Sequence, residues 1–223
     1  MAPYKHSFLK MAFEARALKF GEFTLKSGRI SPYFFNASAF STGQQLATLG
    51  RCYRDAILDA GVDFDGLYGP AYKGIPLASS VAIAFSEIDR DVPVSFNRKE
   101  IKDHGEGGQL LGAPLTGQVL AIDDVVTAGT AVRESVEIVQ AHGANLGAFC
   151  VALDRQERGQ EGTQSALTEL AARFNLTPIS IVTLDDVLAF AADDPRIDDA
   201  IAPQIEVYRS AYGAADSTRF RKI

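Results

Sequence analysis

The chain has 223 residues, of which 47% are hydrophobic and 22% charged, and its formal net charge is −6. This composition is typical of a globular protein with a sizeable buried core. The acidic balance argues against nucleic-acid or membrane-surface binding, and no apolar run approaches membrane-spanning length. Cys52 and Cys150 lie among apolar neighbours, so we expect buried free thiols in a reducing cytoplasm.

The first forty or so residues predict a small lobe beside the main fold. Residues 4–19 have the apolar spacing of an amphipathic helix, and residues 20–29 predict two short strands around a Ser-Gly turn. The aromatic cluster at 31–36 follows, and aromatic side chains in a strand more often belong to a core than to a ligand platform. A second amphipathic helix is expected at 43–60, where Gly61 ends it.

Strands and helices alternate in the rest of the chain. Apolar runs predict strands at 66–69, 92–96, 118–122, 146–153 and 179–184. Helices are expected between and after them at 75–84, 131–141, 163–174, from 185 to Pro195, and through 197–208. This alternation predicts an α/β fold with a parallel, doubly wound sheet of about five strands.

The stretch 119–130 is the most informative part of the chain. Its buried strand is followed by two adjacent carboxylates, Asp123 and Asp124, and by the small-residue turn 127–130 before a helix. Backbone N–H groups and the helix dipole would attract an anion here, so we expect a phosphate. Because carboxylates repel phosphate, we expect the acidic pair to accept hydrogen bonds from sugar hydroxyls or to act through a bound cation such as Mg²⁺.

Two further segments bring cations towards the expected sheet edge. Lys73 lies in a tight turn at the carboxyl end of a strand, where open α/β sheets bind ligands. Residues 97–108 are mostly titratable or glycine, which predicts a long mobile loop. Its acidic and basic charges balance, so the segment could equally be a solvated flap. If the loop is extended, Arg98, Lys102 and His104 lie on one side and Lys99 on the other.

Residues 122–130 resemble the 5-phosphoribosyl 1-diphosphate (PRPP) loop of the type I phosphoribosyltransferases, with two acids followed by two apolar residues and Thr-x-Gly-Thr. Segments 20–36, 69–76, 97–108 and 153–159 also resemble motifs of one branch of that family, the bacterial orotate phosphoribosyltransferases. The likeness extends to about Gly213. It implies the type I phosphoribosyltransferase fold, with a small N-terminal hood lobe and a mobile catalytic loop.

The resemblance also implies how the chain is divided. A single phosphoribosyltransferase domain would span residues 1–213, and residues 214–223 would form a flexible tail. Within the domain the expected parts are a hood at about 1–40, a core at about 62–185 and C-terminal helices at 186–213.

The implied reaction joins orotate to C1 of PRPP, releases pyrophosphate and gives orotidine 5′-monophosphate for pyrimidine biosynthesis. An oxocarbenium-like ribose calls for charge stabilisation and positioning rather than a protein nucleophile. The implied catalytic residues are Lys102, Asp123, Asp124, Arg98 and His104. The implied PRPP-binding residues are Lys26, Tyr72, Lys73, Arg98, Lys99, Lys102, His104, Asp123, Asp124, Val125, Val126, Thr127, Ala128, Gly129, Thr130 and Ala131.

Orotate is a flat pyrimidine with a carboxylate, and the resemblance implies that Lys26, Phe34, Phe35, Thr127 and Arg155 bind it. The two phenylalanines would do so through both backbone and ring. A surface ion pair is the other interpretation of Arg155, although a guanidinium suits a carboxylate clamp. Mg²⁺ is the implied cofactor, held mainly by substrate and water oxygens near the acidic pair, with no direct protein ligand assigned. The family also has a cis peptide bond at the position of Ala71 and Tyr72.

The resemblance implies a homodimer in which the loop containing Arg98, Lys102 and His104 serves the partner's active site. Two alternatives remain at this point. A phosphoribosyltransferase for a purine base would share the PRPP loop, but it has no use for a carboxylate clamp. A PRPP-sensing regulator would keep the fold and could dispense with the cationic loop.

Overall fold

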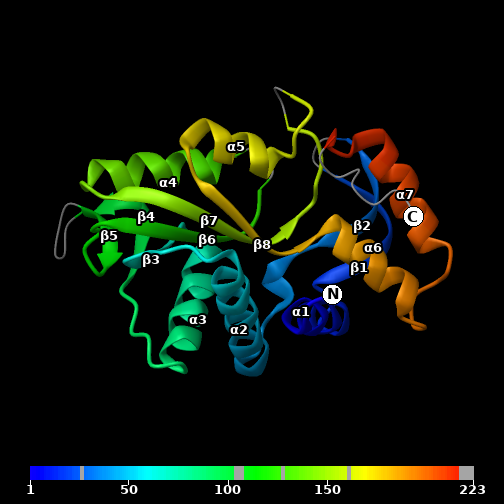
Figure 1. Cartoon of the computed structure of the whole chain (residues 1–223), viewed down its shortest axis with the longest axis horizontal. Coiled ribbons are helices and arrows are strands. Elements are labelled where there is room, and N and C mark those ends of the chain that lie inside the picture. Colours follow the sequence, from blue (N-terminus) through cyan, green and yellow to red (C-terminus); the bar gives the residue numbers. More distant parts are fainter. Residues whose placement is uncertain (26–27, 103–107, 127–128, 160–161, 216–223) are drawn as a thin grey trace.

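A six-stranded sheet forms the centre of the molecule (Figure 1), with strand order β5-β4-β3-β6-β7-β8. The computed structural model describes residues 1–25, 28–102, 108–126, 129–159 and 162–215. The strands are β3 (Gly66–Gly69), β4 (Val94–Lys102), β5 (Gly108–Gly112), β6 (Gln118–Val125), β7 (Asn145–Asp154) and β8 (Thr177–Thr183). All neighbours pair in parallel except β5, which runs antiparallel to β4. The predicted parallel α/β sheet is therefore confirmed, with β5 as an added edge strand.

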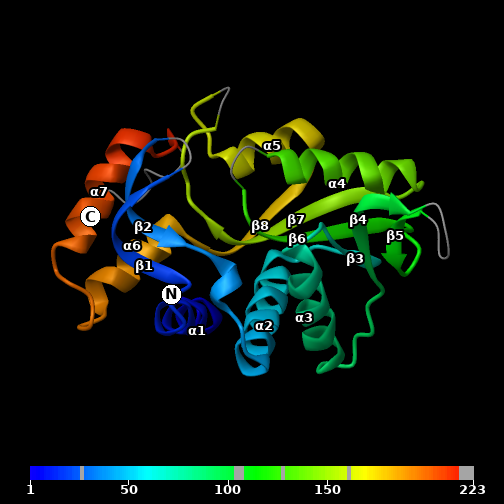
Figure 2. The ribbon, with the colours of Figure 1, turned by 180° about the vertical axis from the view of Figure 1, so that it is seen from behind.

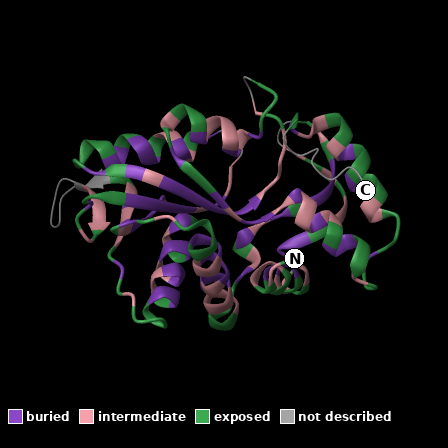
Figure 3. Cartoon of the chain, viewed as in Figure 1, coloured by how far each residue is buried: buried purple, intermediate pink, exposed green. Residues whose placement is uncertain are grey.

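Helices cover both faces of this sheet, as both ribbon views show (Figures 1 and 2). On one face lie α2 (Gly43–Ala60) and α3 (Gly74–Ser86), and on the other lie α4 (Thr130–Ala141) and α5 (Ala166–Phe174). The central strands β6 and β7 are consequently buried along most of their length (Figure 3). This is why they read as continuous apolar runs rather than alternating ones.

The N-terminal lobe packs with the C-terminal helices. It contains α1 (Pro3–Glu14), a short 3-10 helix (Ala37–Ala39) and an antiparallel ribbon of β1 (Leu18–Thr24) and β2 (Ile30–Phe35). Helices α6 (Leu184–Asp193) and α7 (Ile201–Tyr212) lie beside it in both views. Lys5 of α1 forms an ion pair of 2.9 Å with Asp186 of α6. Asp186 also completes the capping box of Thr183 at the start of α6.

Several segments differ from the prediction; the last helix, for example, spans Ile201–Tyr212 rather than 197–208. The first helix ends at Glu14 rather than residue 19, because Arg16 adopts a left-handed conformation with φ 57° before β1. The segment expected as a long loop from residue 97 instead continues β4 to Lys102, because β5 supplies a paired neighbour. The expected tail does not begin at 214, since Ala214 is buried and its N–H donates to the carbonyl of Gln156 (2.8 Å).

Among the described residues, no helix has the length and apolarity needed to cross a membrane.

Candidate active site

The candidate site lies along the carboxyl ends of β4, β3, β6 and β7. These strands are consecutive neighbours in the sheet and all run in the same direction. The segments that follow β3, β6 and β7 therefore meet at one edge, together with the last residues of β4. Four of the predicted motifs are brought together in this way, although they are far apart in the sequence.

The acidic pair lies near the carboxyl end of β6, in the middle of this end of the sheet. Asp124 is 5% exposed, and Lys73 Nζ donates to its Oδ2 at 2.6 Å. The backbone N–H of Asp124 donates to Asp123 Oδ1 at 2.8 Å, and the Tyr53 hydroxyl donates to the Asp123 carbonyl at 2.8 Å. Burial, and then the neighbouring Asp124 carboxylate, raise the pKa of Asp123 to about 7. A cation or hydroxyl donors arriving here would favour its charged form.

The turn after β6 ends at the N-terminus of α4, as the phosphate-site prediction requires. Gly129 precedes this helix with φ 73°, a left-handed conformation that favours glycine. A Cβ on Gly129 would also collide with the side chain of Leu170 on α5. Val125, Val126 and Ala131 are half-buried and Thr130 is exposed. Thr127 and Ala128 lie outside the described residues.

The turn after β3 places two predicted PRPP residues next to the acidic pair. The peptide bond between Ala71 and Tyr72 is cis, as the family resemblance implies. Tyr72 is 67% exposed, and Lys99 Nζ of β4 lies 5.7 Å from the centre of its ring. Asn97 Oδ1, also on β4, accepts a hydrogen bond of 2.7 Å from the Ala71 N–H. Tyr72, Lys73 and Lys99 are thus grouped beside Asp124.

Asn97 is a residue that the sequence analysis missed. It is only 7% exposed although its side chain is polar, and it holds the backbone of the cis turn. Because both Asn97 and Lys99 reach that turn, they share a face of β4, and the half-buried Arg98 between them lies on the other face. This matches the predicted alternation as far as residue 99. The Lys102 side chain and His104 lie outside the described part of the chain.

Arg155 follows β7, and its guanidinium is already engaged. Its Nε and Nη2 donate to one oxygen of Glu157 at 2.8 and 2.5 Å. The guanidinium carbon lies 4.6 Å from the centre of the Tyr33 ring, and Nη2 lies 3.5 Å from the Tyr208 hydroxyl. Arg155 is therefore fixed between the N-terminal lobe and α7. Glu157, Tyr33 and Tyr208 are contacts that the sequence did not predict.

The two phenylalanines expected at the orotate site face opposite ways, as neighbours on a strand must. Phe34 is 37% exposed and stands 5.6 Å from the ring of Phe23. Phe35 is 8% exposed and packs between Phe8 and Phe40 at 6.0 and 6.4 Å. The prediction of a ring contact from Phe35 is therefore corrected: only its backbone remains for a ligand. Lys26 lies outside the described residues.

The carboxylates of this site suit a metal ion that is held mainly by substrate and water oxygens. No group of three or more His, Cys, Asp or Glu side chains gathers among the residues that the structure describes. Asp123 and Asp124 form an acidic pair, and one of them already has Lys73 as its partner. Two carboxylates beside the turn before α4 fit a Mg²⁺ ion whose other ligands are substrate and water oxygens.

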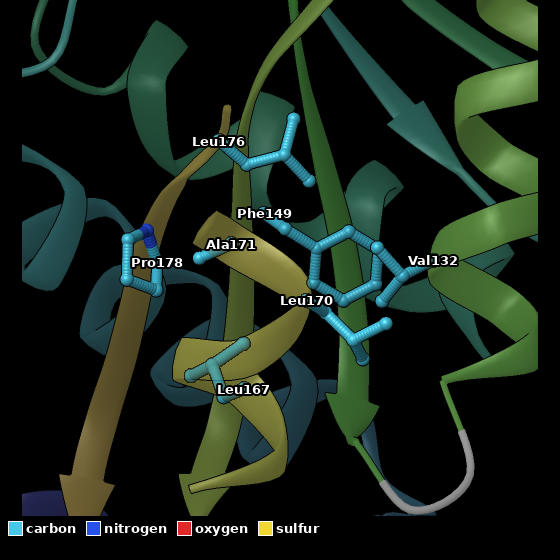
Figure 4. Close-up of a pocket in the computed structure, with 7 residues that line it drawn as sticks. All are labelled: Val132, Phe149, Leu167, Leu170, Ala171, Leu176 and Pro178. Carbon is cyan, nitrogen blue, oxygen red and sulfur yellow. The ribbon is translucent and has the colours of Figure 1, made fainter. Parts of the chain in front are cut away.

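A separate apolar gap lies between α5 and the sheet (Figure 4). The residues around it include Val132, Phe149 and Leu170, and all of the residues that line it are apolar. It offers no hydrogen-bonding side chain to a phosphate or a pyrimidine, so we assign it to packing.

Comparisons with known proteins agree with this geometry. The family described as "Phosphoribosyl transferase domain" matches residues 44–173. An orotate phosphoribosyltransferase of Cronobacter sakazakii is 55% identical over 214 residues, which is 96% of this chain and 100% of the relative. One from Klebsiella pneumoniae is 53% identical over the same shares.

Solved structures give the same result. The crystal structure of orotate phosphoribosyltransferase from Francisella tularensis matches with a TM-score of 0.83 and 39% identity, covering 93% of this chain and 99% of that one. The Mycobacterium tuberculosis enzyme in complex with PRPP has a TM-score of 0.62 at 22% identity, over 83% and 99%, and supports the fold. The chain thus belongs to the orotate phosphoribosyltransferases, transferases built on the type I phosphoribosyltransferase fold.

Proposed function

We propose that the chain transfers the 5-phosphoribosyl group from PRPP to orotate, giving orotidine 5′-monophosphate and pyrophosphate for pyrimidine biosynthesis. The observation that carries the choice of base is Arg155, a largely buried cation at the end of β7, next to the strand that ends in the acidic pair. A purine base has no carboxylate for this guanidinium. A regulator that only sensed PRPP would not need it.

PRPP would lie across the ends of β3 and β6. Asp123 and Asp124 would accept hydrogen bonds from the ribose hydroxyls, and the turn from Val125 to Ala131 would hold the 5-phosphate at the start of α4. Tyr72, Lys73 and Lys99 would face the pyrophosphate. Lys73 is half exposed and already paired with Asp124, so we expect its ammonium to be shared with, or passed to, the incoming phosphate oxygens.

Orotate would lie between the exposed ring of Phe34 and Arg155. The Phe34 ring offers an apolar surface, the Phe35 backbone offers amide-type partners, and the guanidinium pairs with the carboxylate. Lys26 and Thr127 remain proposed contacts on the strength of the family likeness. This arrangement would point the ring nitrogen of orotate at the ribose carbon that loses pyrophosphate.

Catalysis would come from charge stabilisation without a covalent intermediate. Asp123 and Asp124 would hold the ribose as it becomes cationic, and Arg98, Lys102 and His104 would neutralise the departing pyrophosphate. When bound near the acidic pair, Mg²⁺ would supply further charge neutralisation on the phosphate oxygens. Closing the β4–β5 arm over the ribose would keep water from the reactive carbon.

We further propose a homodimer in which Arg98, Lys102 and His104 serve the site of the partner subunit. Arg98 lies on the face of β4 away from its own pyrophosphate turn, which supports this division. Cys52 and Cys150 are buried free thiols, which fits a reducing cytoplasm as the place of action.

The test is the choice of acceptor base. The purified protein is incubated with PRPP and Mg²⁺ together with orotate, uracil, adenine or hypoxanthine, and pyrophosphate release is followed. We expect release with orotate and little with the three bases that lack a carboxylate. Equal rates with uracil and orotate, or a preference for a purine, would reject the assignment of the base.

A further inference from the structure

The Arg155 guanidinium has two edges that could bind a carboxylate, and Glu157 occupies one of them. Nε and Nη2 both donate to Glu157 Oε1, so this edge is closed to a ligand. The Tyr33 ring covers one flat face at 4.6 Å. No described residue accepts a hydrogen bond from Nη1. Nη2 also donates to the Tyr208 hydroxyl at 3.5 Å, so Nη1 is the nitrogen left for a substrate.

Glu157 itself is held firmly in place. The Tyr208 hydroxyl donates to its Oε1 at 2.9 Å, and Arg29 Nη1 donates to its Oε2 at 3.3 Å. Its carbonyl accepts the N–H of Ala166 at 3.1 Å, and its backbone forms a β-bridge with Gly213. These partners come from the N-terminal lobe, from α7 and the residue after it, and from the first residue of α5. A side chain fixed from three directions is suited to orient its neighbour rather than to move aside.

The charges around Glu157 also indicate an orienting role. Two guanidinium groups, those of Arg29 and Arg155, contact this single carboxylate. This small cluster therefore keeps one positive charge in excess, which a carboxylate ligand would neutralise. Without Glu157 the same space would hold two cations and no fixed direction for either of them.

We propose that Glu157 is a positioning residue for the carboxylate-bearing base. It fixes the Nε–Nη2 edge of Arg155 so that Nη1 faces the orotate carboxylate, and Tyr208 and Arg29 hold Glu157 in place. The inference rests on the proposed orotate function and deepens it. It makes α7, through Tyr208, part of the specificity for the base.

The experiment measures KM for orotate, KM for PRPP, kcat and Tm in the full-length protein. Glu157→Gln keeps the size of the side chain and removes its charge, and Tyr208→Phe removes one of its supports. Glu87→Gln is the matched control, because Glu87 also pairs with arginines, Arg51 and Arg54, but on the remote surface of α2 and α3.

We expect Glu157→Gln to raise KM for orotate about tenfold, since a charge-assisted hydrogen bond is lost from the orienting edge. KM for PRPP should stay within about twofold of wild type, and Tyr208→Phe should shift KM for orotate in the same direction by less. The control should match wild type in every quantity.

An unchanged or lower KM for orotate in Glu157→Gln would overturn the inference, because Glu157 would then be irrelevant or a competitor of the substrate. A parallel rise of both KM values with a lower Tm would also overturn it, as the mark of a merely structural role. The wild-type protein reports separately on the proposed function: if it does not consume orotate, that proposal fails whatever the variants do.

Discussion

Asp123 is expected to make the ligand-free protein less stable as pH rises, whereas most carboxylates make a protein more stable as pH rises. Its pKa is raised from 3.8 to about 7 by burial and by the Asp124 carboxylate. Between these values the native state keeps a proton that the unfolded chain has lost. The free energy of unfolding therefore falls as pH rises through this window, and the loss is complete above the folded pKa.

Replacing Asp123 by Asn removes this titration and keeps the shape of the side chain. One pKa unit corresponds to about 1.4 kcal/mol, so the full shift amounts to about 4 kcal/mol. About half of it develops between pH 5.5 and 8.5, because part of the window lies below pH 5.5. Over this range we expect Asp123→Asn to gain about 2 kcal/mol in unfolding free energy relative to wild type.

The assay is urea unfolding followed by circular dichroism at several pH values, at one fixed protein concentration so that association does not vary. Asp63→Asn, a change at an exposed aspartate, serves as the matched control for the background. If the stability difference between Asp123→Asn and wild type is flat across this pH range, burial does not disfavour the Asp123 carboxylate and the electrostatic account of the acidic pair is wrong.

Other sites give sharper tests of single contacts. Lys102→Ala and Asp124→Asn should each be nearly inactive, yet mixing them with subunit exchange should restore about a quarter of wild-type activity; no recovery despite proven exchange rejects the shared site. Asn97→Ala leaves the Ala71 N–H unpaired and should lower kcat/KM for PRPP about tenfold, while the Kd for orotate stays unchanged. A wild-type kcat/KM for PRPP would contradict the positioning role. Gly129→Ala should unfold more easily than Gly143→Ala by about 1–3 kcal/mol, because both have positive φ but only Gly129 meets Leu170; equal urea midpoints would refute this.

Local pattern was enough to predict the main strands, the order of elements and the turn between β6 and α4. Apolar runs such as the one before Asp123 indicate a strand that is buried on both faces. The small residues around Gly129 indicate a turn whose backbone conformation disfavours larger side chains. Strand alternation makes Phe34 and Phe35 face opposite ways. It could not say which ring is buried, because this depends on Phe8 and Phe40.

The supporting contacts of the site could not be predicted, because their partners are distant in sequence. Glu157 meets Tyr208 across 51 residues, and Asn97 meets Ala71 across 26. Nothing near either residue signals the partner, and only the packing of α7 and β4 brings each pair together. Likewise, the extension of β4 to Lys102 depends on its pairing with β5, whereas the local composition favours a loop.

The central claim is that the acidic pair and Arg155 bind different substrates, and calorimetric titration tests it most directly. Wild type, Arg155→Leu and Asp124→Asn are each titrated with orotate and with PRPP plus Mg²⁺. Arg155→Leu should weaken orotate binding by about 2–4 kcal/mol and leave PRPP binding almost unchanged, because only the carboxylate loses its partner. Asp124→Asn should weaken PRPP binding and leave orotate binding almost unchanged. Equal losses of both ligands in both variants, or full orotate affinity in Arg155→Leu, would contradict the account.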